Sequence, residues 1–148
     1  MTIWKLTDDV WWSNHTCLCD KLPPEVRAVL GAGRNIADLA PENSPANIPE
    51  KVPYFSICWP DHERVDHNYF RLLVETIELI VRHGRLPLLV HCRAGQQRAP
   101  TVAVLAASII ATGRPVISER LLQEAKRLRP DILTKPFYQS ILERAGVI

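Results

Sequence analysis

The chain has 148 residues, 47% of them hydrophobic and 23% charged, which is enough for a single domain spanning residues 1–148. Its net charge of +2 is too small to argue for nucleic-acid binding, although residues 75–148 carry 11 basic and 6 acidic groups. No run approaches the roughly 20 apolar residues of a membrane span, and the first nine residues lack the plan of a signal peptide. We therefore expect a soluble, cytoplasmic and monomeric protein that binds neither membranes nor nucleic acids.

The first third of the chain predicts short elements. Residues 1–20 predict one or two edge strands in which Trp11 and Trp12 pack. Residues 23–33 predict a short helix, because two prolines stand in its first turn and two glycines at its end. Residues 35–39 then favour a strand.

The middle of the chain predicts a loop, a strand and a helix. Residues 41–53 hold four prolines and indicate an exposed loop. Residues 54–59 are rich in residues typical of strands. From His67 to His83 the apolar residues recur at helical spacing, and Gly84 ends that helix.

The last elements complete an alternating pattern. An apolar run at residues 86–90 predicts a strand, and residues 99–112 predict a helix. Two further helices are expected at residues 118–129, with Ser118 as N-cap, and at residues 136–145. Alternating strands and helices predict an α/β fold with a central, mainly parallel sheet covered by helices on both faces.

The segment His-Cys-Arg-Ala-Gly-Gln-Gln-Arg, residues 91–98, joins the last predicted strand to the helix that follows it. In such a junction successive backbone N–H groups point inward and the helix N-terminus adds partial positive charge, so it can bind a phosphate. The spacing of Cys92 and Arg98 alone is weak evidence. The alternative is a buried structural thiol at Cys92 and a solvated Arg98 at the start of the helix.

The residue types in this segment suit phosphate chemistry. An anion-binding loop favours the thiolate form of Cys92, and the thiolate is the nucleophile. The guanidinium of Arg98 can hold two phosphoryl oxygens at once. Gly95 permits backbone angles that a side chain would resist.

Residues 91–98 resemble the signature loop of the cysteine-based protein tyrosine phosphatases, and the spacing is most similar to the dual-specificity branch. The resemblance covers about residues 52–144. It implies a tyrosine-phosphatase-like fold, a cysteinyl-phosphate intermediate, and no metal or organic cofactor. It also implies that the substrate phosphate is bound by the loop that follows Cys92: Arg93, Ala94, Gly95, Gln96, Gln97 and Arg98.

The expected substrate is a phosphorylated protein or a small phosphate ester. Phosphotyrosine fits the family, as do phosphoserine and phosphothreonine. The family also has branches that act on phosphoinositides and on RNA 5′-phosphates. Arg93 is the one extra basic residue inside the loop, so a highly charged inositol phosphate is not specially provided for.

A phosphate ester also needs a proton donor for its leaving oxygen. Asp61, in Trp59-Pro60-Asp61-His62, follows the predicted strand before Cys92, and the carboxyl ends of parallel strands meet at one sheet edge. From the residues alone, Asp61 is equally an ordinary turn residue, with Glu63 and Asp66 as competitors for an acid role. The stretch resembles the mobile acid loop of the classical tyrosine phosphatases, which implies that Asp61 is the acid and that Asp66 supports the loop.

One departure from the family concerns the second half of the reaction. The family places Ser or Thr directly after the arginine, where its hydroxyl stabilises the departing thiolate, but this chain has Ala99. Thr101 is a candidate to reach inward, or Asp61 and a water suffice with slower turnover. In the extreme case the protein is a pseudophosphatase that binds phosphate with little turnover. His91 is expected to support the loop rather than to react.

The four cysteines do not form a disulfide framework in a chain of this size, so reduced thiols are expected. His15, Cys17 and Cys19 lack a second pair at zinc-site spacing and are interpreted as part of a strand or turn. Cys58 is either a buried thiol or the partner of Cys92 in a reversible disulfide. A sulfurtransferase or a thiol-dependent reductase is a further class with a cysteine in an anion-binding loop.

Overall fold

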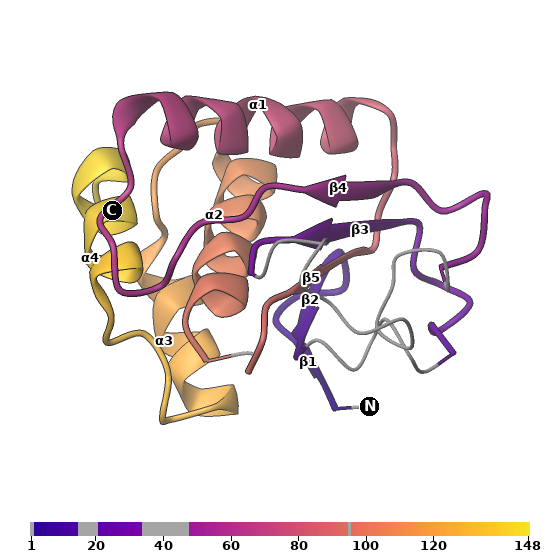
Figure 1. The fold of residues 1–148 in the computed structure, drawn as a ribbon, viewed down its shortest axis with the longest axis horizontal. Helices are drawn as coiled ribbons and strands as arrows, with labels where there is room; N and C mark the ends of the chain where they lie inside the picture. Colours follow the sequence, from indigo (N-terminus) through magenta and orange to yellow (C-terminus); the bar gives the residue numbers. More distant parts are fainter. Residues whose placement is uncertain (1, 15–20, 34–47, 95) are drawn as a thin grey trace.

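The computed structural model describes residues 2–14, 21–33, 48–94 and 96–148. Its centre is a five-stranded sheet with the strand order β1-β2-β5-β3-β4 (Figure 1). β1 pairs with β2 antiparallel, and the other neighbouring strands pair parallel. The predicted α/β fold with a mainly parallel sheet is therefore confirmed. The strands are β1 (Ile3–Lys5), β2 (Val10–Ser13), β3 (Ala28–Gly31), β4 (Tyr54–Ser56) and β5 (Leu88–His91).

Four helices follow β4, and all four were predicted. They are α1 (His67–Arg82), α2 (Arg98–Thr112), α3 (Glu119–Leu128) and α4 (Pro136–Ala145). Their ends carry the expected signals, since the side chains of Asp66 and Ser118 accept backbone N–H groups at the starts of α1 and α3. Gly84, with φ of 63°, follows the end of α1 in the left-handed region that favours glycine. In the part of the chain described, no helix is both long and apolar enough to span a bilayer.

Alternate residues along the strands point to opposite faces of the sheet, and each face packs against its own apolar layer. Trp12, Leu30 and Val90 face the layer that holds the buried side chains of all four helices. α2 contacts β2 and β5 on one side and the other three helices on the other, so it lies in the middle of this layer (Figure 1). Its buried residues number eleven of fifteen, which explains why the segment is apolar almost all round.

The second face of the sheet carries Trp11, Val29 and Leu89. Among the described residues it is covered by side chains from the segments before β3 and β4, including Leu22 and Ile48, and not by a helix. Both tryptophans of β2 are buried, because β2 lies inside the sheet between β1 and β5. β1 alone forms this edge of the sheet.

The helix predicted over residues 23–33 is wrong. Residues 28–31 form β3, which lies between β5 and β4, and the prolines before it form a turn in which Val26 N–H donates to the Pro23 carbonyl at 3.1 Å. A strand that is buried on both faces has a continuous apolar sequence, and such a run has the same appearance as part of a buried helix. The strand predicted over residues 54–59 is shorter than expected and ends at Ser56. The strand predicted over residues 35–39 lies outside the described residues.

Candidate active site

Three neighbouring parallel strands, β4, β3 and β5, end at the same edge of the sheet. The segment after β5 is the cysteine loop (residues 92–98), and the segment after β4 leads to the acid loop (residues 59–62). β3 lies between them and continues into Gly33. A Cβ atom at Gly33 would lie 2.7 Å from Cys92 Cα, so only glycine allows this approach. Sequence reasoning assigned this glycine to the end of a helix and missed its contact with the cysteine.

Two pockets adjoin at this edge and share Asp61, Arg93 and Arg98. The smaller pocket, of about 190 Å³, is lined by Cys92 and described residues of the cysteine loop, by Asp61, and by Lys135. The larger, of about 500 Å³, is lined by Gly33, Cys58 and the acid loop together with the two shared arginines. The structure thus brings Cys92, Asp61 and Arg98 around one small pocket. Lys135 adds a further cation to the lining of this pocket, and no sequence pattern predicted it. Gly95 lies outside the described residues.

The base of the cysteine loop is buried. Cys92 is 2% exposed and His91 is 3% exposed. His91 Nε2 lies 2.8 Å from the hydroxyl oxygen of Tyr54, within hydrogen-bond distance. A Cβ atom at Gly31 would overlap that hydroxyl, so the glycine makes room for the pair. His91 therefore links β5 to β4 directly below the cysteine.

Arg98 is the first residue of α2 and points into both pockets. Its Nη1 donates a 3.0 Å hydrogen bond to the carbonyl oxygen of Trp59 in the acid loop. Its Nε is buried and has no hydrogen-bond partner among the described residues. A buried donor left unpaired costs about 1–3 kcal/mol, and an anion in the pocket would satisfy it.

The acid loop is held by a backbone hydrogen bond at Asp61 and by the packing of the Trp59 ring. The Asp61 carbonyl accepts a hydrogen bond from Phe137 N–H at 3.1 Å, and the Trp59 ring lies 4.8 Å from the ring of Tyr69. The Asp61 side chain is 34% exposed, and its Oδ1 lies 3.7 Å from Nδ1 of His62. The backbone of Asp61 is therefore held against α4, and its carboxyl group remains accessible to a bound molecule.

Tyr69 connects the acid loop to the start of α1. Asp66 is the N-cap of that helix, and its Oδ1 accepts the Tyr69 N–H at 2.7 Å. The Tyr69 hydroxyl in turn donates to the Ile57 carbonyl at 2.7 Å. Burial, and then the charge of Cys58, raise the pKa of Tyr69 well above its usual range, while Arg98 opposes them. Tyr69 thus stays a hydrogen-bond donor, and it lies between the N-cap residue Asp66 and the Trp59 ring of the acid loop.

The outer part of the cysteine loop rests on the connection between α3 and α4. Gln96 donates to Asp131 at 2.8 Å, and Arg129 donates both to Asp131 at 2.9 Å and to the Ala94 carbonyl at 2.8 Å. The hydrogen bonds from Gln96 and Arg129 lower the pKa of Asp131. The guanidinium of Arg129 also lies 4.6 Å from the centre of the Trp4 ring. Ala94 and Gln96 were predicted as part of the phosphate-binding loop, whereas no role was predicted for Arg129 or Asp131.

Gln97 and Thr101 use their side chains in contacts away from the thiol. Gln97 Oε1 accepts N–H groups from Thr134 and Lys135, at 2.8 and 3.0 Å. The Thr101 hydroxyl donates to the Gln97 carbonyl at 2.5 Å, so its proton is used within the first turn of α2. Ala99 is fully buried and offers no hydroxyl.

Within the described residues, neither Cys58 nor Cys92 forms a disulfide. Cys58 lines the larger pocket, and its Sγ lies 3.4 Å from the Ser56 hydroxyl. His15, Cys17 and Cys19 lie outside the described residues. Within the ranges that the structure describes, no group of three or more His, Cys, Asp or Glu residues is placed to hold a metal ion.

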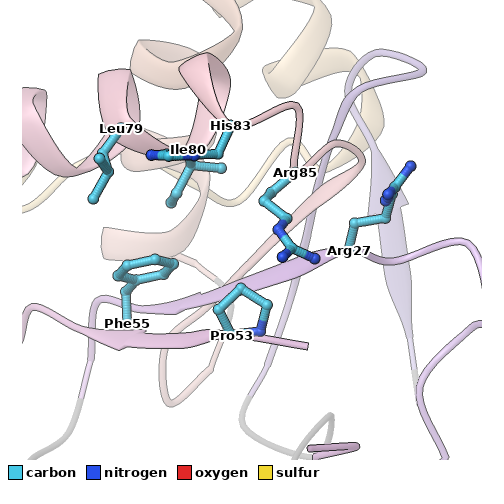
Figure 2. A pocket seen from close by; sticks show the side chains of 7 residues that line it. All are labelled: Arg27, Pro53, Phe55, Leu79, Ile80, His83 and Arg85. Atoms are coloured by element: carbon cyan, nitrogen blue, oxygen red, sulfur yellow. The ribbon is translucent and has the colours of Figure 1, made fainter. Parts of the chain in front are cut away.

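A separate pocket of about 400 Å³ lies at the opposite ends of β3 and β4, under the end of α1 (Figure 2). Arg27 and Arg85 stand on one side of it, and Phe55 lies below Ile80 on the other (Figure 2). Its lining residues include neither a thiol nor a carboxylate. It therefore lacks the thiol and the carboxyl group that the predicted chemistry requires, and the pockets beside Cys92 are the candidate active site.

Solved structures with this fold share little sequence with the chain. The crystal structure of Tk-PTP in its active form has a TM-score of 0.67 and 20% identity, and the match covers 97% of this chain and 95% of that one. Human DUSP28 has a TM-score of 0.68 and 18% identity over 97% and 91% of the two chains. The human tyrosine phosphatase-like serine/threonine/tyrosine-interacting protein has a TM-score of 0.70 and 15% identity over 96% and 94%. The chain therefore has the fold of the tyrosine and dual-specificity phosphatases.

No protein-family model matches the sequence, and no curated protein is detectably similar to it. The fold agrees with the family that residues 91–98 resemble. What the chain does with this fold has to be argued from the pockets beside Cys92.

Proposed function

We propose that the protein is a phosphatase that hydrolyses phosphate monoesters through a cysteinyl-phosphate intermediate. The observation that carries the proposal is the lining of the smaller pocket, where the thiol of Cys92 and the guanidinium of Arg98, both in the cysteine loop, meet the carboxyl group of Asp61 in the acid loop. The unpaired, buried Nε–H of Arg98 supports an anionic occupant.

In the first step the Cys92 thiolate attacks phosphorus, and the bond between phosphorus and the leaving oxygen breaks. Asp61 gives its proton to that oxygen, which leaves as an alcohol or phenol. Arg98 and the N–H groups of the cysteine loop hold the remaining phosphoryl oxygens and balance the charge that shifts onto them.

In the second step water attacks the phosphorus of the cysteinyl phosphate. Asp61, now a carboxylate, takes a proton from the water, and the sulfur leaves as a thiolate. The products are inorganic phosphate and the original protein, so atoms and charge balance. The two steps use only side chains of this chain and water.

We propose phosphotyrosine, and phosphoserine or phosphothreonine, in a protein or a small ester as the substrate. The larger pocket beside the phosphate position is lined by Trp59, Pro60 and His62, and it offers room for the group that carries the phosphate. Arg93 lines both pockets and is exposed, so it is placed to contact an acidic neighbour of the phosphate. Among proteins of this fold, Siw14 from S. cerevisiae is described as a PP-IP phosphatase, so inositol phosphates belong in a substrate panel.

A second candidate function is a phosphate-binding pseudophosphatase. It is favoured by Ala99, which offers no hydroxyl to the departing thiolate, and by the use of the Thr101 proton within α2. Without such a hydroxyl, the second step is the one that slows. The protein would then accept one phosphoryl group and keep it.

A chromogenic aryl phosphate separates the two candidates. The phosphatase predicts continuing release of the phenol over many turnovers, which Cys92→Ser abolishes. Asp61→Asn slows this turnover by about 10²- to 10⁴-fold even with a good leaving group, because it also removes the base of the second step. The pseudophosphatase predicts one equivalent of phenol per chain and then no further release. Asp8→Asn, an exposed aspartate remote from both pockets, is the matched control and should behave as the parent does. Full activity in Cys92→Ser would reject both candidates.

A further inference from the structure

We infer that Gln97 is a positioning residue that fixes the acid loop relative to the cysteine loop through the start of α4. The inference rests on the proposed function, because it assigns Gln97 a part in the same reaction. It gives the amide of Gln97 a role different from binding phosphate.

The side chain of Gln97 makes three hydrogen bonds to the segment before α4. Its Oε1 accepts N–H groups from Thr134 at 2.8 Å and from Lys135 at 3.0 Å, and its Nε2 donates to the Thr134 hydroxyl at 3.2 Å. The residue is only 7% exposed. An amide that makes three such bonds is oriented by them and has its acceptor oxygen turned to residues 134–135.

These contacts hold the chain just before the first turn of α4. Lys135 is the N-cap of α4, and its side chain makes no capping hydrogen bond. The N–H groups at a helix start need acceptors from outside the helix, and Gln97 supplies one to the N-cap residue and to the residue before it. The start of α4 is therefore set by a side chain of the cysteine loop.

Two residues further on, α4 reaches the acid loop. The Phe137 N–H donates to the Asp61 carbonyl at 3.1 Å, and the fully buried Phe137 ring packs edge-on against Tyr69 at 6.0 Å. Tyr69 also lies against Trp59. A displacement of residues 134–137 would thus move the backbone of the proposed proton donor.

Gln97 itself is firmly placed. It precedes α2 as the N-cap residue, and its carbonyl accepts the Thr101 hydroxyl at 2.5 Å. The next residue, Arg98, makes its own bond to the Trp59 carbonyl. Two consecutive residues of the cysteine loop therefore hold the acid loop by separate routes, one direct at Trp59 and one through α4 at Asp61.

Substitution at Gln97 tests this route by its dependence on the leaving group. Gln97→Leu removes all three bonds, and Gln97→Glu keeps the two N–H acceptor contacts. A shift of the acid by about 1 Å can lower kcat/KM about 10²-fold. The loss should be large for esters whose leaving oxygen needs a proton. We expect Gln97→Leu to lower kcat/KM about 10²-fold for an alkyl phosphate and at most a few-fold for 4-nitrophenyl phosphate, whose leaving group departs readily. Gln97→Glu adds a negative charge beside the phosphate position and should lower kcat/KM on both esters, but the ratio of the two values should stay within a few-fold of the parent's ratio.

The matched control is Gln123→Leu, which removes an exposed glutamine that bonds only within α3, to Glu119. It should leave both esters unaffected. Equal losses of kcat/KM on both esters in Gln97→Leu would mean that Gln97 acts on the thiol or on general stability, which overturns the inference. Gln97→Asn shortens the side chain by one methylene and takes the place of Gln97→Leu if the latter does not fold.

Amide hydrogen exchange gives a second measurement that needs no turnover. Loss of the Gln97 contacts should speed exchange at residues 134–137 and also at residues 57–62, which Gln97 does not touch directly. Exchange that rises only at residues 134–137 would contradict the route through α4. A parent protein without phosphatase activity would refute the proposed function, and this exchange measurement would still decide whether Gln97 couples the two loops.

Discussion

Arg98 Nη1 donates a hydrogen bond to the carbonyl oxygen of Trp59, so the guanidinium that faces the small pocket also holds the loop that carries Asp61. Its Nε remains available to an anion. Binding of phosphate and placement of the acid are therefore linked through one side chain.

Arg98→Lys should lower kcat/KM for an aryl phosphate by about 10²- to 10³-fold, because an ammonium group lacks the planar arrangement of donors that bonds two oxygens of one phosphoryl group in parallel and also reaches the Trp59 carbonyl. Steady-state kinetics measure the loss. Arg120→Lys, at an exposed position on α3, is the control. A loss below about three-fold would show that the paired N–H donors of the Arg98 guanidinium do not hold the phosphoryl oxygens.

Ala99→Ser should raise the steady-state rate with an aryl phosphate about ten-fold and leave the initial burst of phenol unchanged, since the added hydroxyl acts when sulfur leaves phosphorus. Stopped-flow absorbance separates the burst from the steady phase. Ala111→Ser, an exposed position near the end of the same helix, should change neither phase. A steady-state rate that Ala99→Ser does not alter would place the slow step elsewhere.

Gly33→Ala should lower the free energy of unfolding by about 1–3 kcal/mol and reduce activity, because the new Cβ would lie 2.7 Å from Cys92 Cα. Chemical denaturation and aryl phosphate kinetics measure the two effects. Gly84→Ala is the comparison: its φ of 63° makes alanine unfavourable, but nothing lies within 4 Å of the added Cβ, so it should lose stability and keep kcat. Equal kcat values in both variants would contradict the contact between Gly33 and the cysteine.

Asp131→Asn should weaken the dependence of stability on acid pH. Hydrogen bonds from Gln96 and Arg129 lower the pKa of Asp131 in the folded chain, so the carboxylate stabilises the fold above its ordinary pKa, near pH 4. That contribution is lost as the pH falls through the lowered folded value. Thermal unfolding between about pH 7 and pH 3 should therefore show a smaller decrease in Tm for Asp131→Asn than for the parent. Identical decreases would show that these bonds do not favour the charged form.

The elements that the sequence predicted well have their signals within a few residues. Residues 136–145 were predicted as a helix and form α4 with the same bounds, because a proline stands at its first position and Gly146 follows its last. β3 was missed for the opposite reason. Burial on both faces is decided by distant segments, and it removes the alternation that identifies a strand.

The site likewise contains residues that a local sequence signal marks and residues that only the folded chain brings together. Cys92 and Arg98 stand in one short segment, so a local pattern was enough to select them. The parallel strand ends place Asp61 at the same sheet edge, but the resemblance to the family's acid loop, and not the residues alone, favoured it over Glu63 and Asp66. Lys135 and Gly33 join the site from 43 residues after and 59 residues before Cys92, and no local pattern marks them. Gln97 was predicted as part of the phosphate-binding loop, but the bonds of its side chain to residues 134–135 could not be predicted, because they depend on where α4 docks.

The central claim is that phosphorus is transferred to the sulfur of Cys92. The most direct test of this claim uses an aryl phosphate whose phosphorus is radioactive. The protein is mixed rapidly with this ester and quenched with acid, and the labelled residue is then found by peptide mapping. The account predicts up to one labelled phosphoryl group per chain, bound at Cys92 and absent in Cys92→Ser. Label on another residue, or hydrolysis that continues in Cys92→Ser, would contradict it.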